Sequence, residues 1–258
     1  MRALYTAATG MSAQQLKIDN IANNLANVST TGYKKTRESF EDLIYQNIPI
    51  GGASVDNPRP TLLQVGTGVH TVALTRDFRN GDMVYTGNEF DLALGKRGFF
   101  VLEGPGGEER YTRDGHFVKN VDGELVTAEG YKLQPSVEIP EDAVRVVVAE
   151  DGTVQAEFAD TTELVTVGQV QVVDFVNPSG LRNLGGNLYQ VTPESGEPQI
   201  LDPEEGFVQV NQGFLENSNV DIAEELINMV LAQRAFETNS KVIQTEDDNM
   251  QTINTLKR

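Results

Sequence analysis

Apolar residues recur every seven positions at both ends of the chain, and this spacing constrains the fold more than any other feature. In the N-terminal stretch the repeat, with its partners three residues later, consists of Leu4, Met11, Ile18 and Leu25 with Ala7, Gln14, Ile21 and Val28. Near the C-terminus the corresponding line is Ile222, Met229, Phe236, Ile243 and Met250, with Leu226 as the first partner. Such a repeat is typical of α-helices that pack along a common seam. We therefore predict a long amphipathic helix at each end, of roughly 25 and roughly 37 residues.

Local sequence marks where each predicted helix begins or ends. The first should stop within 29–32, where β-branched residues meet a glycine. The second should begin at Ser218 or Asp221, since either side chain can cap it. Gly10 inside the first helix costs about 1 kcal/mol relative to alanine. Neither helix can bury its apolar stripe alone, so the two ends should pair within one monomer, against neighbouring copies, or both.

The middle of the chain is divided by turn-forming dipeptides that contain glycine. They are Asn80-Gly81, Asp114-Gly115, Asp122-Gly123 and Asp151-Gly152. Short strand-like runs lie between and beyond them, at 98–102, 124–126, 144–148 and 164–175. Because short strands joined by tight turns are typical of antiparallel sheets, we predict an antiparallel β domain here.

Together these patterns predict an α+β fold of four segments. Residues 1–40 form an N-terminal assembly helix with the segment that follows it, and residues 215–258 form a C-terminal assembly helix. These two helices pack as a coiled-coil-like pair. Residues 41–70 form an extended arm or linker, because glycine and proline interrupt a polar stretch without clear period. Residues 71–214 form the β-rich domain.

Charge and composition exclude several classes of function. The net charge is −18, and residues 51–214 carry eleven basic and twenty-six acidic side chains, which would repel nucleic-acid phosphates. The sequence contains no run of about 18 apolar residues, so we expect no membrane insertion. The N-terminus has no apolar core of a secretory signal, so we expect no cleaved signal peptide. There is no cysteine, His70 and His116 are isolated, and no nucleophile or phosphate-loop motif occurs. We predict no catalytic residue, no cofactor and no metal.

Three stretches of the sequence resemble the bacterial flagellar rod, hook and hook-associated axial protein family. The first, residues 21–34, reads IANNLANVSTTGYK and is similar to the N-terminal signature of that family. The second, residues 233–241, is similar to the C-terminal axial motif. The third, residues 111–117 continuing through 123–127, resembles the core shared by rod and hook subunits. Length and the segment 40–69 are most similar to members of the distal rod type.

The resemblance implies a structural subunit of the distal rod, not an enzyme. Such a subunit polymerises helically through its terminal helices into a rigid drive shaft that transmits torque from motor to hook. The implied location is the flagellar basal body, in the rod that crosses the periplasm, after export without signal cleavage. The implied partners are further copies of the chain, proximal rod subunits, hook subunits, the P- and L-ring proteins and the flagellar type III export apparatus. The β-rich domain is expected outside the helical tube.

The seven-residue spacing and the family signature also identify candidate contact residues. The predicted packing seam consists of Leu4, Met11, Ile18, Ile21, Leu25, Ile222, Leu226, Met229, Phe236 and Ile243. Polar contacts between subunits are predicted for Asn20, Asn23, Asn24 and Asn27, because side-chain amides can specify register.

Three alternatives remain open from the sequence. The first is a hook or proximal rod subunit, which the segment 40–69 should distinguish. The second is a peptidoglycan-acting enzyme, which requires two carboxylates held across a cleft. The third is a β-domain binding module with a helical dimerisation tail, which predicts a small closed oligomer.

Overall fold

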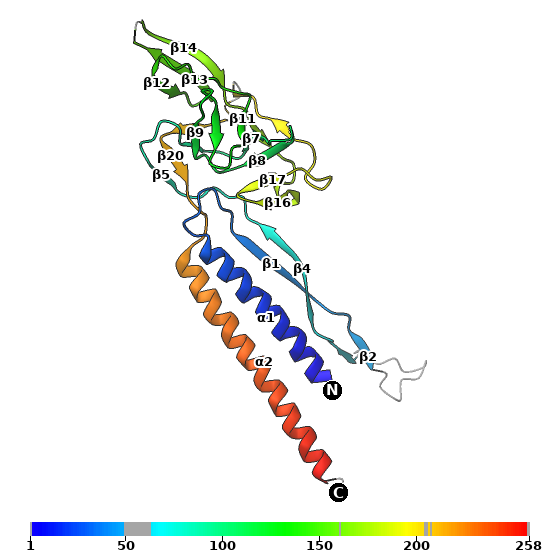
Figure 1. Ribbon diagram of the computed structural model, residues 1–258. Helices are drawn as coiled ribbons and strands as arrows, with labels where there is room; N and C mark the ends of the chain where they lie inside the picture. The colour runs from blue at the N-terminus through cyan, green and yellow to red at the C-terminus, as the bar shows by residue number, and fades with distance from the viewer. Residues whose placement is uncertain (1, 49–62, 160, 204–205, 207, 257–258) are drawn as a thin grey trace. The chain divides into compact units, whose positions relative to one another are not determined.

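A long helix lies at each end of the chain, with short strands between (Figure 1). The computed structural model describes residues 2–48, 63–159, 161–203, 206 and 208–256. The helices are α1 (Arg2–Ala26), α2 (Ile222–Leu256) and the 3-10 helix η1 (Pro178–Gly180). The strands before residue 120 are β1 (Thr36–Asp42), β2 (Gln46–Ile48), β3 (Leu63–Val65), β4 (Val69–Arg76), β5 (Met83–Tyr85), β6 (Leu92–Leu94), β7 (Phe99–Glu103), β8 (Glu109–Thr112) and β9 (Phe117–Lys119). The later strands are β10 (Leu125–Thr127), β11 (Lys132–Gln134), β12 (Ala143–Val148), β13 (Thr153–Phe158), β14 (Thr161–Gln169), β15 (Val172–Asp174), β16 (Arg182–Gly185), β17 (Leu188–Gln190), β18 (Gln199–Ile200), β19 (Val210–Gln212) and β20 (Phe214–Glu216).

The elements divide into two units. The helical unit comprises residues 1–25, 36–75 and 221–258, and so contains both long helices. The β-rich unit comprises residues 26–35 and 76–220. The short segment 26–35 therefore joins the β-rich unit, although the residues on either side of it belong to the helical unit.

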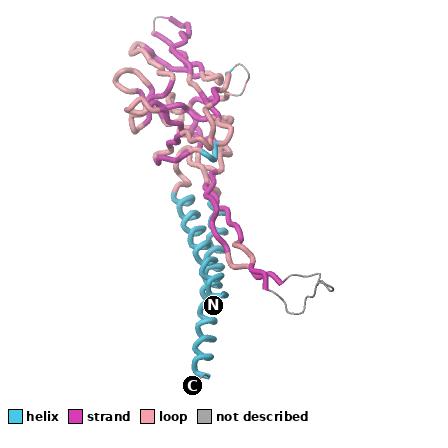
Figure 2. Tube along the Cα trace, turned by 90° about the vertical axis from the view of Figure 1, so that its right-hand side faces the viewer, coloured by secondary structure: helices cyan, strands magenta, loops and turns pink. Residues whose placement is uncertain are grey.

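In the helical unit, α1 and α2 lie side by side and run in opposite directions (Figures 1 and 2). The predicted helices and their pairing are confirmed. The first has 25 residues and is followed by turns that lead to Gly32, whose φ is 67°. The second begins after Asp221, whose Oδ1 accepts the N–H groups of Ala223 and Glu224 at 2.8 and 3.2 Å. Asp221, not Ser218, therefore provides the side-chain cap.

Strands β1 to β4 also belong largely to the helical unit. β1 pairs with β4, and β2 pairs antiparallel with β3, with Gln46 opposite Val65. Both pairs come from the segment predicted to be an arm or from its flanks. Residues 49–62 of that predicted arm lie outside the described residues.

The β-rich unit confirms the predicted, mostly antiparallel middle of the chain. Its largest sheet has the order β16-β17-β8-β7-β11-β10-β9, and in addition β15 pairs with β7 and β18 pairs with β15. A separate sheet has the order β12-β13-β14. The main apolar core includes Phe100, Leu102 and Phe117, and it is built where short apolar strands turn one face inward.

Two of the four glycine dipeptides form the predicted hairpin turns, and two do not. Gly123 and Gly152 each have φ near 86°, which favours glycine, and each closes a tight turn. The prediction was wrong for Asp114-Gly115, because the strands before and after it, β8 and β9, do not pair with each other. A Cβ on Gly115 would lie 1.5 Å from the carbonyl oxygen of Leu92. Glycine is therefore required there by a close backbone approach.

Candidate assembly surface

The α1 residues of the predicted seam face the interior of the helical unit to different degrees. Ile21 is buried, whereas Leu4, Met11, Ile18 and Leu25 are half-buried. A half-buried apolar side chain on a long helix still presents area that further packing can cover. The α1 part of the seam is therefore only partly used within one chain.

The α2 residues of the predicted seam separate into two groups. Met229, Phe236 and Ile243 are half-buried, but Ile222 and Leu226 are 49% and 46% exposed. Residues seven apart differ by only about 20° around a helix, so Ile222 points nearly the same way as Met229 and is exposed because less of the helical unit covers the start of α2.

Small residues, which a search for large apolar side chains overlooks, mark the centre of the helix contact. Ala232 on α2 is 2% exposed, and Ala7 and Ala13 on α1 are also buried. A Cβ on Gly10 would lie 2.9 Å from Nδ2 of Asn239, so α1 and α2 approach closely at this point. The spacing of small residues along α1 was the available signal, since small side chains allow two helices to come close.

A continuous apolar strip lies on the first turns of α2. We call it the α2 strip, and its members are 46–62% exposed: Ile222, Leu226, Ile227, Val230 and Leu231. At 100° per residue its members lie between about 80° and about 160° from the buried Ala232, and Val230 and Ile227 are the most nearly opposite to it. Helix α2 therefore carries apolar side chains on two faces in its first turns. An exposed contiguous apolar surface of this kind is typical of a site that binds another protein.

Two of the predicted contact asparagines fasten the start of β1 to α1. Asn24 donates to the carbonyl oxygen of Thr36 at 2.9 Å and accepts the Thr36 N–H at 3.0 Å. Asn20 donates to the same carbonyl at 2.9 Å and to Oε2 of Glu38 at 2.6 Å. Both asparagines are buried, so these bonds replace water for the strand backbone.

The other two asparagines lie differently. Asn23 is exposed on α1, and Oδ1 of Asn27 accepts the hydroxyl of Thr30 at 3.2 Å. Contacts of these four side chains with another subunit stay a prediction. Within one chain, Asn20 and Asn24 already have a structural role.

A buried ionic cluster organises the β-rich unit, and its carboxylate was missed in the sequence. Glu216 at the end of β20 accepts Nζ of Lys34 at 2.7 Å and Nε of Arg113 at 2.9 Å. It also accepts the backbone N–H of Gly81 at 2.8 Å. All three charged side chains are at most 2% exposed. Lys34 and Arg113 belong to stretches that carry the family resemblance, and this was the only signal for the cluster.

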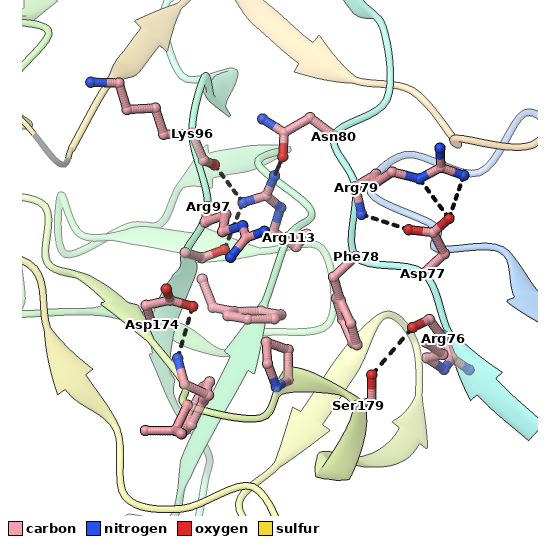
Figure 3. A pocket seen from close by; sticks show the side chains of 15 residues that line it. Arg76, Asp77, Phe78, Arg79, Asn80, Lys96, Arg97, Arg113, Asp174 and Ser179 are labelled. Carbon is pink, nitrogen blue, oxygen red and sulfur yellow. Dashed lines mark hydrogen bonds and ion pairs between the residues drawn. The ribbon is translucent and has the colours of Figure 1, made fainter. Parts of the chain in front are cut away.

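The remaining hydrogen bonds of the cluster join distant segments of the chain. Arg113 donates to the carbonyl oxygens of Lys96 and Gly98 at 2.9 and 2.7 Å, and to Oδ1 of Asn80 at 2.8 Å (Figure 3). Lys34 donates to the carbonyl of Arg79 at 2.9 Å. One guanidinium and one ammonium therefore hold several loops around a single carboxylate.

Two cations and one anion leave an excess positive charge in the cluster, and the pKa values respond to it. Burial lowers the pKa of Lys34 to about 8, and the charge of Arg113 acts in the same direction against the attraction of Glu216. Burial alone would raise the pKa of Glu216, but the charges of Arg113 and Lys34 outweigh it and hold that pKa below its ordinary value.

Among the described residues, no group of three or more His, Asp or Glu side chains is placed to hold a metal ion. None of the described helices is both long and apolar enough to cross a membrane. The features found in the described residues are the exposed α2 strip and the buried ion pairs of Glu216.

Family models match three separate stretches of the chain. Residues 4–34 match the model described as flagella basal body rod protein. Residues 93–156 match the flagellar hook protein FlgE/F/G D1 domain, and residues 211–256 match the flagellar basal body rod FlgEFG protein C-terminal model. Each of the three matched stretches contains one of the resemblances found in the sequence.

Curated relatives match along the full length. The flagellar basal-body rod protein FlgG of Borreliella burgdorferi is 44% identical, over 100% of this chain and 99% of that protein. The FlgG protein of Caulobacter vibrioides is 41% identical, over 100% of both chains. The FlgF protein of the same organism is 32% identical, over 93% of this chain and 91% of that protein. Of these two Caulobacter vibrioides proteins, FlgG is more similar to this chain than FlgF is.

Proposed function

Because this chain belongs to the flagellar basal-body rod protein family, we propose that it is a structural subunit of the distal rod. It polymerises helically through its terminal helices into the rigid shaft that transmits torque from the motor to the hook. The similarity to FlgG proteins over the whole length supports the distal type over a proximal rod or hook subunit.

The observation that carries the assembly role is the α2 strip. Five exposed apolar side chains on consecutive turns cost free energy in water, at about 25 cal/mol per Å² of apolar surface. A second helix from a neighbouring copy would cover them. Contact between two different faces of identical subunits does not close a ring, and it generates a helical filament. Close packing of such helices resists bending, as a drive shaft requires.

Each segment of the chain has its own part in the proposed assembly. The two helices form a coiled-coil-like assembly domain, residues 41–70 form an extended arm toward neighbours, and 71–214 form the outer domain. The seam residues Leu4, Met11, Ile18, Ile21, Leu25, Ile222, Leu226, Met229, Phe236 and Ile243 complete their burial in the polymer. The role is structural and not catalytic.

We place the chain in the basal body, in the part of the rod that crosses the periplasm. Its partners there are further copies of itself, proximal rod subunits, hook subunits and the P- and L-ring proteins. It reaches that place through the flagellar type III export apparatus without a cleaved signal peptide. Family membership supports the basal-body location and the rod and hook partners.

Deletion of the gene, followed by electron microscopy of purified basal bodies, tests this function. Cells without the chain should form basal bodies that stop before the distal rod, with no hook, and a plasmid copy should restore both. Complete rods with attached hooks in the deletion strain would contradict the proposal.

A further inference from the structure

The cations of the β-rich unit are concentrated in one place. The sequence of this unit holds twelve basic and twenty-six acidic residues, a net charge of −14. Five of the twelve line a single recess of about 690 Å³: Arg76, Arg79, Lys96, Arg97 and Arg113. Among the described residues, the only acidic side chains that line it are Asp77 and Asp174. A positively charged hollow thus lies in a unit that is acidic as a whole.

The recess combines an aromatic wall with a cationic rim (Figure 3). Phe78, Phe99 and Phe175 belong to one edge-to-face cluster, with ring centroids of Phe78 and Phe99 5.4 Å apart and of Phe99 and Phe175 5.6 Å apart. Arg79, Lys96 and Arg97 are exposed at the rim. Because Phe99 and Phe175 are buried, the rings form a rigid backing behind the exposed cations, and those cations can bind carboxylates of a segment that enters the recess.

The hydrogen bonds identify which rim cation is available to a ligand. Arg113 is saturated by the ionic cluster, and Arg79 pairs with Asp77 at 2.6 Å. Arg76 lies over the ring of Tyr189, at 5.5 Å from its centroid, and Lys96 donates to the carbonyl of Gly206. For the Arg97 guanidinium, the described part of the chain provides no hydrogen bond or ion pair.

The same unit carries an acidic turn of complementary chemistry. Residues 140–143 form a tight turn in which the Ala143 N–H donates to the carbonyl of Pro140 at 3.2 Å. Glu141 and Asp142 occupy its tip and both are exposed, with no ion pair to a described residue. In the comparable turn at 149–152, the Asp151 carboxylate is partly occupied within its own chain, because its Oδ1 accepts a hydrogen bond from the Thr153 N–H at 2.9 Å. None of the residues 140–143 lines the recess of its own chain.

We propose that the recess receives the Pro140–Ala143 turn of a second copy of the chain, with Arg97 binding Glu141 or Asp142. This contact deepens the proposed function and rests on it, because it forms only between subunits of the rod. It offsets the repulsion between outer units that each carry a net charge of −14. It also fixes their register, since the cations that line this recess attract a carboxylate pair to one defined place.

Photocrosslinking in assembled rods tests the contact directly. Val176 lines the recess and is 77% exposed, so a photoreactive amino acid can replace it without disturbing the core. Val121 lies outside the recess and is 97% exposed, which makes it the matched control position. After irradiation of purified basal bodies, the Val176 variant should give a covalent dimer whose joined peptide includes residues 140–143 of the second copy. The Val121 variant should not give that peptide.

The outcomes separate this inference from the function on which it rests. If the chain is present in rods but crosslinks elsewhere, to another protein, or not at all, the proposed contact is wrong and the rod function stands. If the wild-type chain is absent from rods, both proposals fail.

Charge reversal provides a second readout. Arg97→Glu should reduce the number of completed rods per cell by about two- to fivefold for one exposed ion pair, and so should Glu141→Arg combined with Asp142→Arg. The variant that carries all three changes should recover the wild-type number, whereas Arg182→Glu, an exposed cation outside the recess, should not change it. Wild-type rod numbers after the reversal on either side, or no recovery when both sides are reversed, would overturn the proposal.

Discussion

At the scale of single residues, Glu216 joins three distant parts of the β-rich unit. Its carboxylate forms ion pairs with Lys34 and Arg113 and accepts a hydrogen bond from the Gly81 N–H, and these three residues lie far apart in the sequence. A carboxylate at this depth is stable only because two cations compensate its loss of water. Loss of the carboxylate leaves both cations buried without their anion.

Glu216→Gln should therefore lower the free energy of unfolding by about 3–5 kcal/mol. Chemical denaturation of the full chain measures this, with Asp122→Asn as the control at an exposed acidic position. A loss below about 1 kcal/mol would show that the cluster contributes little to stability.

The same variant should change the response to acid. The folded-state pKa of Glu216 lies below the ordinary value of 4.5, so its contribution is complete above that value and is lost as the pH falls through the folded pKa. Below about pH 4.5 the wild-type chain should thus lose stability with falling pH more steeply than Glu216→Gln. Parallel curves of unfolding free energy against pH for the two proteins would contradict this assignment.

At the scale of elements, the two helices of the helical unit have unequal faces. Helix α1 approaches α2 through small residues, and α2 is apolar both on its inward face and on the α2 strip. The last ten residues of α2, 247–256, are all exposed. One chain therefore leaves much of α2 uncovered, which suits a subunit that completes its packing in a polymer.

The closeness of Gly10 to Asn239 predicts the outcome of a paired substitution. Gly10→Ala gains up to about 1 kcal/mol of helix propensity, but its Cβ would lie 2.9 Å from Nδ2 of Asn239. The single variant should thus be near neutral, and Gly10→Ala in an Asn239→Ala background should be stabilising by about 1 kcal/mol. Thermal unfolding followed by the helical signal measures both. An equal effect of Gly10→Ala in the two backgrounds would mean that the helices do not meet there.

The sequence predicted the two helices and the β-rich middle, because these depend on local periodicity. It did not predict that Ile222 and Leu226 would be exposed. A seven-residue repeat shows that a stripe exists and does not show which partner covers it. The Glu216 cluster could not be predicted from the sequence either, because Lys34, Arg113 and Glu216 come together only in the folded chain.

At the scale of the whole molecule, the chain combines uncovered apolar area on its helices with an acidic β-rich unit. The apolar area favours association, and the like charge of −14 on each β-rich unit opposes it unless contacts are specific. A regular polymer satisfies both conditions, because every copy can meet its neighbours through the same pair of faces.

In the proposed function, the exposed α2 strip is the surface through which the rod assembles. The most direct measurement is a count of complete rods in basal bodies from cells whose only copy carries Leu231→Asp, beside cells with Val121→Asp. Leu231 is 57% exposed, so the variant subunit should keep its circular dichroism spectrum, yet lose about 1.5–3 kcal/mol at each contact that buries this side chain. We predict at least a tenfold fall in complete rods for Leu231→Asp and no change for Val121→Asp. Wild-type numbers of rods built from the folded Leu231→Asp chain would contradict the account.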